Sequence, residues 1–241
     1  DLSSLRNVGM GGQALSVGLL NEFRAACPDV VMGTGYGMTE TAGSVAMGMG
    51  EDFIRKSASA GRALSLVEMR IETPDGTVLP TGSAGEIVVR GPMVMQGYWQ
   101  QPEATAAVLS LDGWLRTGDI GYLDDEGYLF IVDRVKDMVI SGGENIYCAE
   151  VERIINAMPG VAECAAFGIP DERLGELLVA RVVGDALDDG AVIAEVAEKL
   201  ARYKAPAEVR VDITPLPRND VGKVDKRRLR EDWIRTMEGT A

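Results

Sequence analysis

Residues 113–145 read GWLRTGDIGYLDDEGYLFIVDRVKDMVISGGEN, and this stretch decides how the rest of the chain is organised. Two alternating apolar runs, 120–123 and 128–132, flank the tract DDEG at 124–127. Because the glycine of that tract can take a positive φ angle, the pattern predicts a β-hairpin. The run DRVKD at 133–137 follows, and four of its five side chains are charged. Such a run is not expected in a core strand, so it predicts a hinge between two structured parts.

Four short motifs follow one another along the chain. They read YGMTE at 36–40, GWLRTGD at 113–119, DRVKD at 133–137 running into SGGEN at 141–145, and PRNDVGK at 217–223. In this order and at this approximate spacing they resemble the adenylate-forming superfamily, which includes acyl-CoA and aryl-CoA synthetases, adenylation domains of peptide synthetases, and luciferases. The resemblance covers nearly the whole chain, and the four motifs together are far more specific than any one of them.

The overall composition is that of a globular protein with an acidic surface. The 241 residues are 46% apolar, which is enough for one large or two small domains. A net charge of −13 opposes encounter with phosphate-rich surfaces, so a general nucleic-acid or anionic-membrane binder is not expected. Residues 201–230 reverse the sign, with nine Lys/Arg against four Asp/Glu, and a solvated helix face is one explanation. No apolar run approaches the length of a transmembrane segment.

Cysteine and histidine usage excludes several kinds of site. Cys27, Cys148 and Cys164 are few, scattered and odd in number, so neither a disulfide framework nor a CxxC metal site is expected. The sequence has no histidine, which removes Ser-His-Asp and Cys-His catalysis and histidine-ligated zinc. Residues 1–7 do not resemble a signal peptide, and the reducing cytoplasm is the expected compartment.

Glycines mark the first part of the chain. Residues 1–9 look like the end of a buried strand that enters Gly11 and Gly12, where a strand-to-helix turn would itself require glycine. The resemblance implies a second role, in which these two glycines and Gly35 line the acyl pocket.

The sequence GTGYGMTE at 33–40 follows a short apolar strand. Its alternating glycines let a ligand approach the backbone closely, although an ordinary loop would explain them as well. Tyr36 offers a flat face for a purine, Thr39 a hydroxyl for a phosphate oxygen, and Glu40 a hard carboxylate of the kind that Mg²⁺ accepts. The resemblance implies these roles: Tyr36 near adenine, Thr39 at the α-phosphate and Glu40 on the metal.

Residues 57–90 change character to short alternating strands. Runs at 67–71 and 86–90 are joined by the turn-forming sequences PDGT and TGS, so a small antiparallel sheet or β-barrel is expected. For residues 93–98 and the helix that starts near Pro102, the sequence does not separate a pocket from packing.

Asp119 ends the GWLRTGD motif immediately before the hairpin. An ionised carboxylate only accepts hydrogen bonds, so one such group can bind both hydroxyls of a ribose. A turn-capping aspartate is the alternative. The resemblance favours the ribose, and it implies that Arg134 is a second contact to ribose or phosphate. The nucleotide-binding set that it implies is Gly35, Tyr36, Gly37, Thr39, Asp119 and Arg134.

Lys136 occupies the position about which the C-terminal domain of the resembling enzymes swings. A charged residue at a pivot stays hydrated in both orientations, which avoids a buried unpaired charge. Beyond it, two adjacent glycines leave room for a thin chain such as pantetheine, or simply form a tight turn. The resemblance favours CoA ligases and implies a CoA-binding loop made by Ser141, Gly142, Gly143 and Glu144.

The last part of the chain is expected to be a compact α+β domain. Val151, Ile154, Ile155 and Met158 have helical spacing, and strands are expected at 161–168, 177–183 and 209–213, with a helix at 191–202. The loop 215–223 presents Lys223, which matches the adenylation lysine of the family. Its cation would counter the charge that develops when a carboxylate attacks the α-phosphate.

These observations and the resemblance give one interpretation. Residues 1–133 are expected to be the C-terminal part of a large AMP-binding α/β domain with its small β-barrel, and residues 134–241 a mobile α+β domain. The implied enzyme is an acid–thiol ligase that uses ATP, Mg²⁺ and CoA, with Lys223, Thr39 and Glu40 as catalytic residues. Its substrate is a small carboxylic acid, and a homodimer is left open. A peptide-synthetase adenylation domain and a non-catalytic nucleotide- or CoA-binding module are the alternatives.

One departure from the family pattern concerns the phosphate loop. The glycine- and Ser/Thr-rich loop of the family lies upstream of the YGMTE motif, and nothing like it precedes Tyr36. We therefore expect the chain to be a fragment of a longer protein whose upstream part is a missing partner, and to adenylate poorly by itself.

Overall fold

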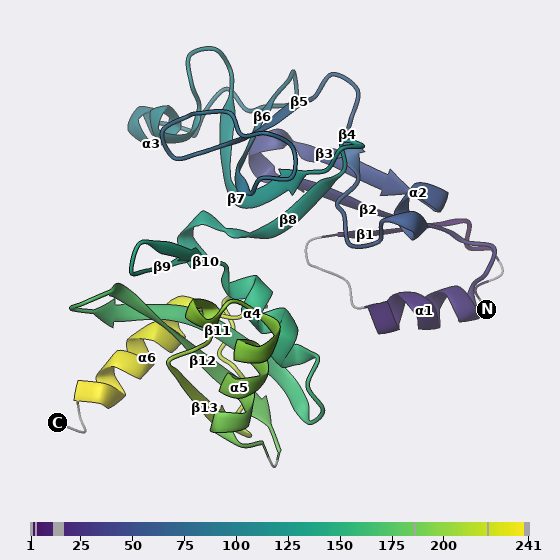
Figure 1. The fold of residues 1–241 in the computed structure, drawn as a ribbon. Helices are drawn as coiled ribbons and strands as arrows, with labels where there is room; N and C mark the ends of the chain where they lie inside the picture. Colours follow the sequence, from purple (N-terminus) through teal and green to yellow (C-terminus); the bar gives the residue numbers. More distant parts are fainter. Residues whose placement is uncertain (1, 3, 12–16, 186, 221, 239–241) are drawn as a thin grey trace. The chain divides into compact units, whose positions relative to one another are not determined.

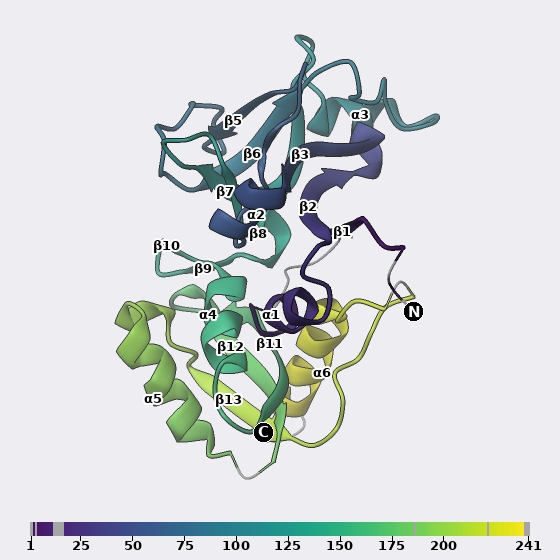
Figure 2. The same ribbon diagram turned by 90° about the vertical axis from the view of Figure 1, so that its right-hand side faces the viewer.

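The chain folds into mixed helices and sheets (Figure 1; Figure 2). The computed structural model describes residues 2, 4–11, 17–185, 187–220 and 222–238. It divides into two compact units, Asp1–Val132 and Asp133–Ala241. The expected combination of an α/β part and an α+β part is confirmed. Within the described part of the chain, every helix is too short or too polar to cross a membrane.

A mixed sheet begins the first unit. Strands β1 and β2 are parallel and are connected through helix α1, whereas β3 and β4 run antiparallel to their neighbours. Helices α1 and α2 cover one part of this sheet with Leu20 and Phe53, which pack against Met32. The elements are β1 (Asn7–Gly11), α1 (Val17–Ala26), β2 (Val31–Met38), the 3₁₀ helix η1 (Thr39–Thr41), β3 (Gly43–Met49), α2 (Gly50–Arg55) and β4 (Arg62–Ala63).

The second sheet of this unit is open. Its strands follow the order β5-β6-β7-β8, and among the described residues the path does not return from β8 to β5. Of the two arrangements expected for this segment, the small antiparallel sheet is confirmed. The barrel does not close among the described strands, because β8 instead forms hydrogen bonds through Leu129 with residues 60–61. The predicted hairpin is confirmed as β7 and β8, with Gly127 at a φ angle of 78° in the turn. The elements are β5 (Glu68–Glu72), β6 (Gly85–Arg90), α3 (Pro102–Val108), β7 (Leu115–Leu123) and β8 (Leu129–Arg134).

The two sheets of the first unit share one hydrophobic core. Val45 and Ala46 from β3 belong to the same buried cluster as Ile87 from β6 and Leu115 from β7. Backbone hydrogen bonds between residues 60–61 and Leu129 join the two sheets at one edge. Burial of these apolar side chains is the main source of stability for such a two-layer arrangement.

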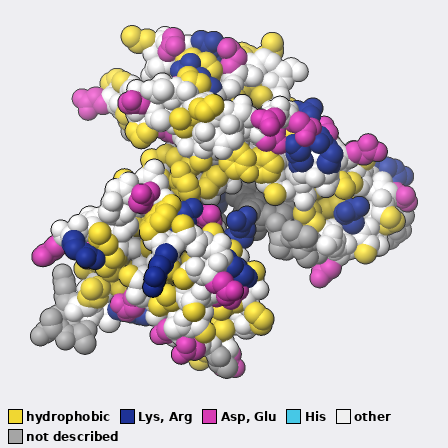
Figure 3. All heavy atoms as spheres, viewed as in Figure 1, with side chains coloured by type: hydrophobic (Ala, Val, Ile, Leu, Met, Phe, Trp, Pro, Cys, Tyr) yellow, Lys and Arg dark blue, Asp and Glu magenta, His cyan; other side chains and the backbone are white. Residues whose placement is uncertain are grey.

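Tyr128 fixes the hairpin to helix α2 and the segment after it. Its ring is buried and lies 4.3 Å from the guanidinium of Arg62 and 4.4 Å from the ammonium of Lys56. Its hydroxyl donates to Asp52 at 2.7 Å and accepts from Arg55 at 2.8 Å. Acidic and basic side chains are interspersed on the face seen in Figure 3.

A five-stranded sheet forms the centre of the second unit. The long hairpin of β11 and β12 carries β9 and β10 on one side, and β13 pairs in parallel with β12 after the crossover through α5. The elements are the 3₁₀ helix η2 (Val135–Asp137), β9 (Val139–Ser141), β10 (Glu144–Ile146), α4 (Cys148–Asn156), β11 (Val161–Asp171), β12 (Gly175–Gly184), α5 (Asp189–Lys199), the 3₁₀ helix η3 (Arg202–Lys204), β13 (Glu208–Asp212) and α6 (Lys226–Glu238).

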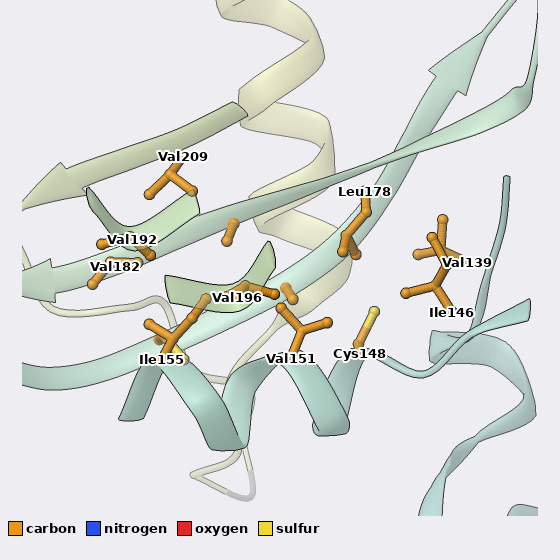
Figure 4. Close-up of a cluster of buried hydrophobic side chains, with 13 residues drawn as sticks. Val139, Ile146, Cys148, Val151, Ile155, Leu178, Val182, Val192, Val196 and Val209 are labelled. Atoms are coloured by element: carbon orange, nitrogen blue, oxygen red, sulfur yellow. The ribbon is translucent and has the colours of Figure 1, made fainter. Parts of the chain in front are cut away.

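Alternating residues of β11 and β12 cover the two faces of this sheet. Successive side chains of a strand point to opposite faces, so Ala166 and Leu178 face helices α4 and α5, whereas Phe167 and Val179 face helix α6. Figure 2 shows the helices on the two sides of the sheet. Figure 4 shows the first of the two cores, including Val139, Ile146, Cys148, Val151, Ile155, Leu178, Val182, Val192, Val196 and Val209.

A small ionic cluster lies inside the second unit. The Lys226 ammonium is 2.8 Å from a carboxylate oxygen of Glu152, which also accepts the N–H of Ala166. Asp133 accepts the N–H of Ala149 in the first turn of α4. Burial raises the pKa of both the Asp133 and the Glu152 carboxyl groups. Burial opposes the charged form of Lys226, but the neighbouring Glu152 raises its pKa.

The position of Asp133 corrects one expectation. We expected the run DRVKD to lie outside any core strand, but β8 continues to Arg134 and Asp133 is only 8% exposed. The buried carboxylate is tolerated because it accepts backbone N–H groups at the start of α4 and from Arg134.

Replacing Lys226 with methionine should expose the energetic role of the ionic cluster. The variant leaves the Glu152 carboxylate mostly buried without its cation, so we expect a loss of about 3 kcal/mol in the free energy of unfolding at pH 8, measured by urea denaturation. Because burial raises the pKa of Glu152, protonation in the folded state should reduce this loss when the pH falls to about 5.

Two comparisons test this explanation. The double variant Lys226→Met/Glu152→Gln should recover most of the stability, whereas Arg227→Met, at an exposed ion pair of the same helix, should change it by less than about 0.5 kcal/mol. An equal loss at both pH values and in the double variant would contradict a charge-based effect.

Candidate functional site

The YGMTE motif lies where β2 ends and the chain turns into β3. The register of this pair shifts between Tyr36 and Gly37. A Cβ atom at Gly37 would lie only 1.9 Å from the carbonyl oxygen of Gly43. Strand packing therefore requires this glycine, whatever else approaches it.

Thr41 holds the turn that follows. Its hydroxyl is buried, accepts the N–H of Met38 at 3.1 Å, and lies 2.8 Å from the carbonyl oxygen of Gly43. Nothing in the sequence pointed to Thr41, because a threonine after a motif carries no signal of its own. The turn leaves Thr39 exposed and Glu40 partly buried.

A β-bulge sets the direction of Asp119. Thr117, Gly118 and Asp119 of β7 all lie opposite Ile87 of β6, because the register of the two strands shifts there. Gly118 adopts a φ angle of 73°. The Thr117 hydroxyl donates to the Ile87 carbonyl at 2.8 Å and accepts the N–H of Asp119 at 3.2 Å. The residues of the GWLRTGD motif thus build the bulge as well as the carboxylate.

The structure brings Tyr36 and Asp119 together. The Tyr36 hydroxyl donates a 2.7 Å hydrogen bond to Asp119 Oδ2, and each residue is 8% exposed. The Tyr36 ring packs in the core between the two sheets of the first unit. Residues from two motifs that are 83 positions apart therefore meet at one buried point.

Glu40 has a partner that the sequence did not reveal. The Tyr98 hydroxyl donates to Glu40 Oε1 at 2.8 Å, and the N–H of Met95 donates to the Glu40 carbonyl at 2.8 Å. The hydrogen bond to the Glu40 carboxylate raises the pKa of Tyr98. The segment 93–98, which the sequence left undecided, thus contacts the expected metal ligand.

The glycines of the expected acyl pocket are partly described. Gly11 of β1 is the register partner of Gly35 of β2, so these two lie side by side. A Cβ atom at Gly11 would meet the Gly35 carbonyl oxygen at 3.5 Å, an ordinary contact. Gly12 lies outside the described residues.

In the second unit, Gly142 and Gly143 form the turn of a two-residue hairpin. Ser141 pairs with Glu144, and the two glycines have φ angles of 60° and 86°. Positive φ at both central positions is the requirement of a type I′ turn, which explains the glycine pair without a ligand. A Cβ atom at Gly143 would meet nothing within 4 Å among the described residues, so the turn also leaves open space.

Lys223 lies on an exposed hairpin loop before α6. Asn219 closes the loop: its side-chain oxygen accepts the N–H of Lys223 at 3.0 Å, and its own N–H donates to the Lys223 carbonyl at 2.8 Å. Arg218 adds an ion pair to Glu163 on β11 at 2.5 Å. The loop is thus anchored to the sheet while the Lys223 side chain is exposed.

Arg134 and Lys136 are exposed at the start of the second unit. The carbonyl of Arg134 accepts the N–H of Met138 around η2 at 3.0 Å. The buried thiol of Cys148, at the first position of α4, donates to the carbonyl of Asp137 at 2.9 Å.

Glu40 is the metal ligand that the resemblance implies. Among the residues that the structure describes, no three or more Asp, Glu, Cys or His side chains gather into a metal-binding group. One carboxylate beside the exposed Thr39 hydroxyl suits Mg²⁺, which keeps several waters and shares ligands with substrate phosphates. The donor set therefore fits that ion and does not fit a structural zinc site.

Two family profiles match the chain in order. The profile described as AMP-binding enzyme matches residues 1–99, and the profile described as AMP-binding enzyme C-terminal domain matches residues 150–223.

Curated and structural relatives extend over most of the chain. The long-chain-fatty-acid–CoA ligase FadD13 of Mycobacterium tuberculosis is 42% identical, over 94% of this chain and 44% of that protein. The amide bond synthetase McbA of Marinactinospora thermotolerans has a TM-score of 0.85 and 37% identity, over 96% of this chain and 48% of its own. The o-succinylbenzoate–CoA synthetase MenE of Bacillus subtilis, in complex with ATP and magnesium ion, has a TM-score of 0.81 and 39% identity, over 94% and 46%.

The chain spans less than half the length of each of these proteins. The matches nevertheless run through both units, from the strand that carries Gly11 to the loop that carries Lys223. The chain therefore belongs to the AMP-binding enzyme family.

Proposed function

We propose that the chain forms part of an ATP-dependent acid–thiol ligase. In the first half of the reaction, an oxygen of a carboxylic acid attacks the α-phosphorus of ATP, and pyrophosphate leaves. In the second half, the thiol of CoA attacks the carbonyl carbon of the acyl-AMP, and AMP leaves. The activation is needed because a carboxylate oxygen is a poor leaving group, whereas AMP leaves readily.

The buried contact between Tyr36 and Asp119 carries this proposal. It joins two motifs at one point and holds the carboxylate of Asp119 in a defined position. A carboxylate held in this way is suited to accept hydrogen bonds from a ribose. Support for the acid and the thiol comes from the relatives, which include acid–CoA ligases.

In the first half of the reaction, five residues are assigned to the nucleotide. Asp119 accepts the ribose hydroxyls, and Tyr36, whose ring is packed in the core, orients Asp119. Arg134 contacts ribose or phosphate. Thr39 donates to the α-phosphate, and Glu40 would hold Mg²⁺, which would offset the charge of the phosphate oxygens.

Lys223 supplies a further positive charge in the first half of the reaction. Its ammonium group stabilises the negative charge that develops as the carboxylate attacks phosphorus. The turn made by Ser141, Gly142, Gly143 and Glu144 is assigned to the second half, where its open side admits the pantetheine arm. Lys136 is the proposed pivot for the change between the two halves.

An amine is a second candidate for the acyl acceptor because of one structural relative. McbA, with a TM-score of 0.85 to this chain, is an amide bond synthetase, so an amine is a candidate acceptor in place of CoA. The first half of the reaction would be the same in both cases.

The reducing cytoplasm is the proposed compartment, and it is supported by three buried cysteines without disulfides.

The reaction is tested on the full-length gene product. Exchange of labelled pyrophosphate into ATP should appear with at least one of a panel of fatty and aryl acids, and AMP release should then depend on CoA. Release that depends on an amine and not on CoA would favour the second acceptor. The absence of exchange with every acid would overturn the adenylation proposal and favour a nucleotide-binding module.

Replacing Asp119 with asparagine tests the ribose contact. Asparagine still accepts from the Tyr36 hydroxyl but lacks the charge and the second carboxylate oxygen. We expect ATP affinity, measured by calorimetry, to fall about 10- to 100-fold, because one charge-assisted hydrogen bond is weakened or lost. Asp75→Asn, in an exposed turn of the same unit, is the matched control and should bind ATP normally. Equal affinities of the two variants would contradict the assignment.

Replacing Lys223 with alanine should separate the two halves of the reaction. Formation of acyl-AMP should slow by about 100-fold or more, since a cation aimed at developing charge is lost. Thioester formation from supplied acyl-AMP should be spared. Arg227→Ala removes an exposed cation four residues later and should affect neither half. Equal losses in both halves would show that the division of roles is wrong.

Replacing Gly143 with asparagine tests the open side of the CoA turn. Asparagine tolerates positive φ, so the turn should persist while its side chain occupies the open space. We expect the KM for CoA to rise about tenfold with acyl-AMP formation unchanged. Gly127→Asn is the matched control, because that glycine also has positive φ and open space around it. An unchanged KM would leave the turn with a structural role only.

A further inference from the structure

Tyr98 and Glu40 are far apart in sequence and share one hydrogen bond. The donor is the Tyr98 hydroxyl and the acceptor is Glu40 Oε1, at 2.8 Å across 58 positions of sequence. The N–H of Met95 donates to the backbone carbonyl of Glu40 at 2.8 Å. The segment that carries Tyr98 is therefore fixed to the backbone of Glu40 as well as to its side chain.

The start of helix α3 holds Tyr98 in this position. The Thr105 hydroxyl accepts the N–H of Tyr98 at 2.9 Å and donates to the carbonyl of Gln101 at 2.9 Å. Gly97 has a φ angle of 152°, and a Cβ atom there would lie 2.9 Å from the Thr105 side chain. Gly97 therefore lies against the Thr105 side chain, and the hydrogen bonds of Thr105 fix the backbone that carries Tyr98.

We infer that Tyr98 is a positioning residue for the Glu40 carboxylate, which it holds ready to bind a divalent cation that accompanies nucleotide phosphate. The inference rests on the proposed function and deepens it. The hydrogen bond engages Oε1 and leaves Oε2 for the cation. An oriented outer partner of this kind commonly sets the affinity of a carboxylate for a metal.

The partner of Glu40 is a neutral tyrosine, which favours a role in positioning the carboxylate over a structural ion pair. Within the described part of the chain, Glu40 makes no ion pair with a lysine or arginine. The tyrosine hydroxyl donates a hydrogen bond but carries no positive charge. The carboxylate therefore keeps the negative charge that attracts a cation.

A carboxylate that binds a cation gains from such support. A glutamate side chain has three rotatable bonds, and fixing it costs conformational entropy when a ligand binds. A site with several carboxylates shares this cost, but the described residues contain no group of three or more Asp, Glu, Cys or His side chains that could hold a metal. A hydrogen bond made before the cation arrives reduces the cost of binding.

The test is a titration of the full-length gene product with Mn²⁺ in the presence of α,β-methylene-ATP, followed by electron paramagnetic resonance. Tyr98→Phe keeps the ring and removes only the hydroxyl, so we expect the dissociation constant for Mn²⁺ to rise about tenfold. Tyr122→Phe is the matched control, because its ring stacks on Phe130 at 5.0 Å in the same unit. An unchanged or lower dissociation constant for Tyr98→Phe would overturn the inference.

A double-mutant cycle shows whether Tyr98 acts through Glu40. In a Glu40→Gln background, removal of the Tyr98 hydroxyl should have little further effect, whereas additive losses would overturn the inference. Thr105→Val provides a second route to the same result if Tyr98→Phe is poorly folded. This substitution removes the hydroxyl that accepts the N–H of Tyr98, so it should also weaken Mn²⁺ binding. Unchanged binding would count against the inference.

Pyrophosphate exchange distinguishes a failure of this inference from a failure of the proposed function. In pyrophosphate exchange, Tyr98→Phe should need about tenfold more Mg²⁺ for half-maximal rate and should approach the parent rate at saturating Mg²⁺. A purely structural defect would lower the rate at every Mg²⁺ concentration. If the parent protein exchanges pyrophosphate with no acid while the Mn²⁺ titration gives the expected shift, the proposed function fails and the role of Tyr98 stands.

Discussion

The hydrogen bond from Tyr36 to Asp119 is a buried polar contact that joins the two sheets of the first unit across their shared core. An unpaired hydroxyl or carboxylate in such a core would cost about 1–3 kcal/mol, so the pair favours one arrangement of β2 against β7. The bulge at residues 117–119 is needed to aim the carboxylate at the tyrosine. The same contact therefore serves the packing of the two sheets and the proposed nucleotide site.

The second unit depends on a different polar contact. Asp133, Glu152 and Lys226 bring the first residue of the unit, helix α4 and helix α6 into one buried cluster. Lys226 follows the Lys223 loop by three residues, so the anchor of α6 also restrains the loop that presents the proposed catalytic lysine. A buried charge of this kind is costly when broken and contributes little when intact, which makes it a device for fixing position more than for stability.

The glycines of the motifs illustrate how structural and functional requirements coincide. Gly37 is required by the close approach of Gly43, and Gly142 and Gly143 are required by the positive φ angles of a two-residue turn. None of these needs requires a ligand. The open space beside Gly143 is nevertheless what a thin substrate arm would use, so a backbone requirement and a binding surface can arise from the same residue type.

The sequence by itself determined the hairpin around residues 124–127, the helical spacing of α4 and the membership of a family, because these depend on local patterns and ordered motifs. Tertiary structure decided that the second sheet stays open, that Asp133 is buried, and that Tyr98 meets Glu40. Each of these depends on residues far apart in the chain, such as the 58 positions between Tyr98 and Glu40. Local propensity carries no information about such pairs, since packing of whole elements decides which distant side chains meet.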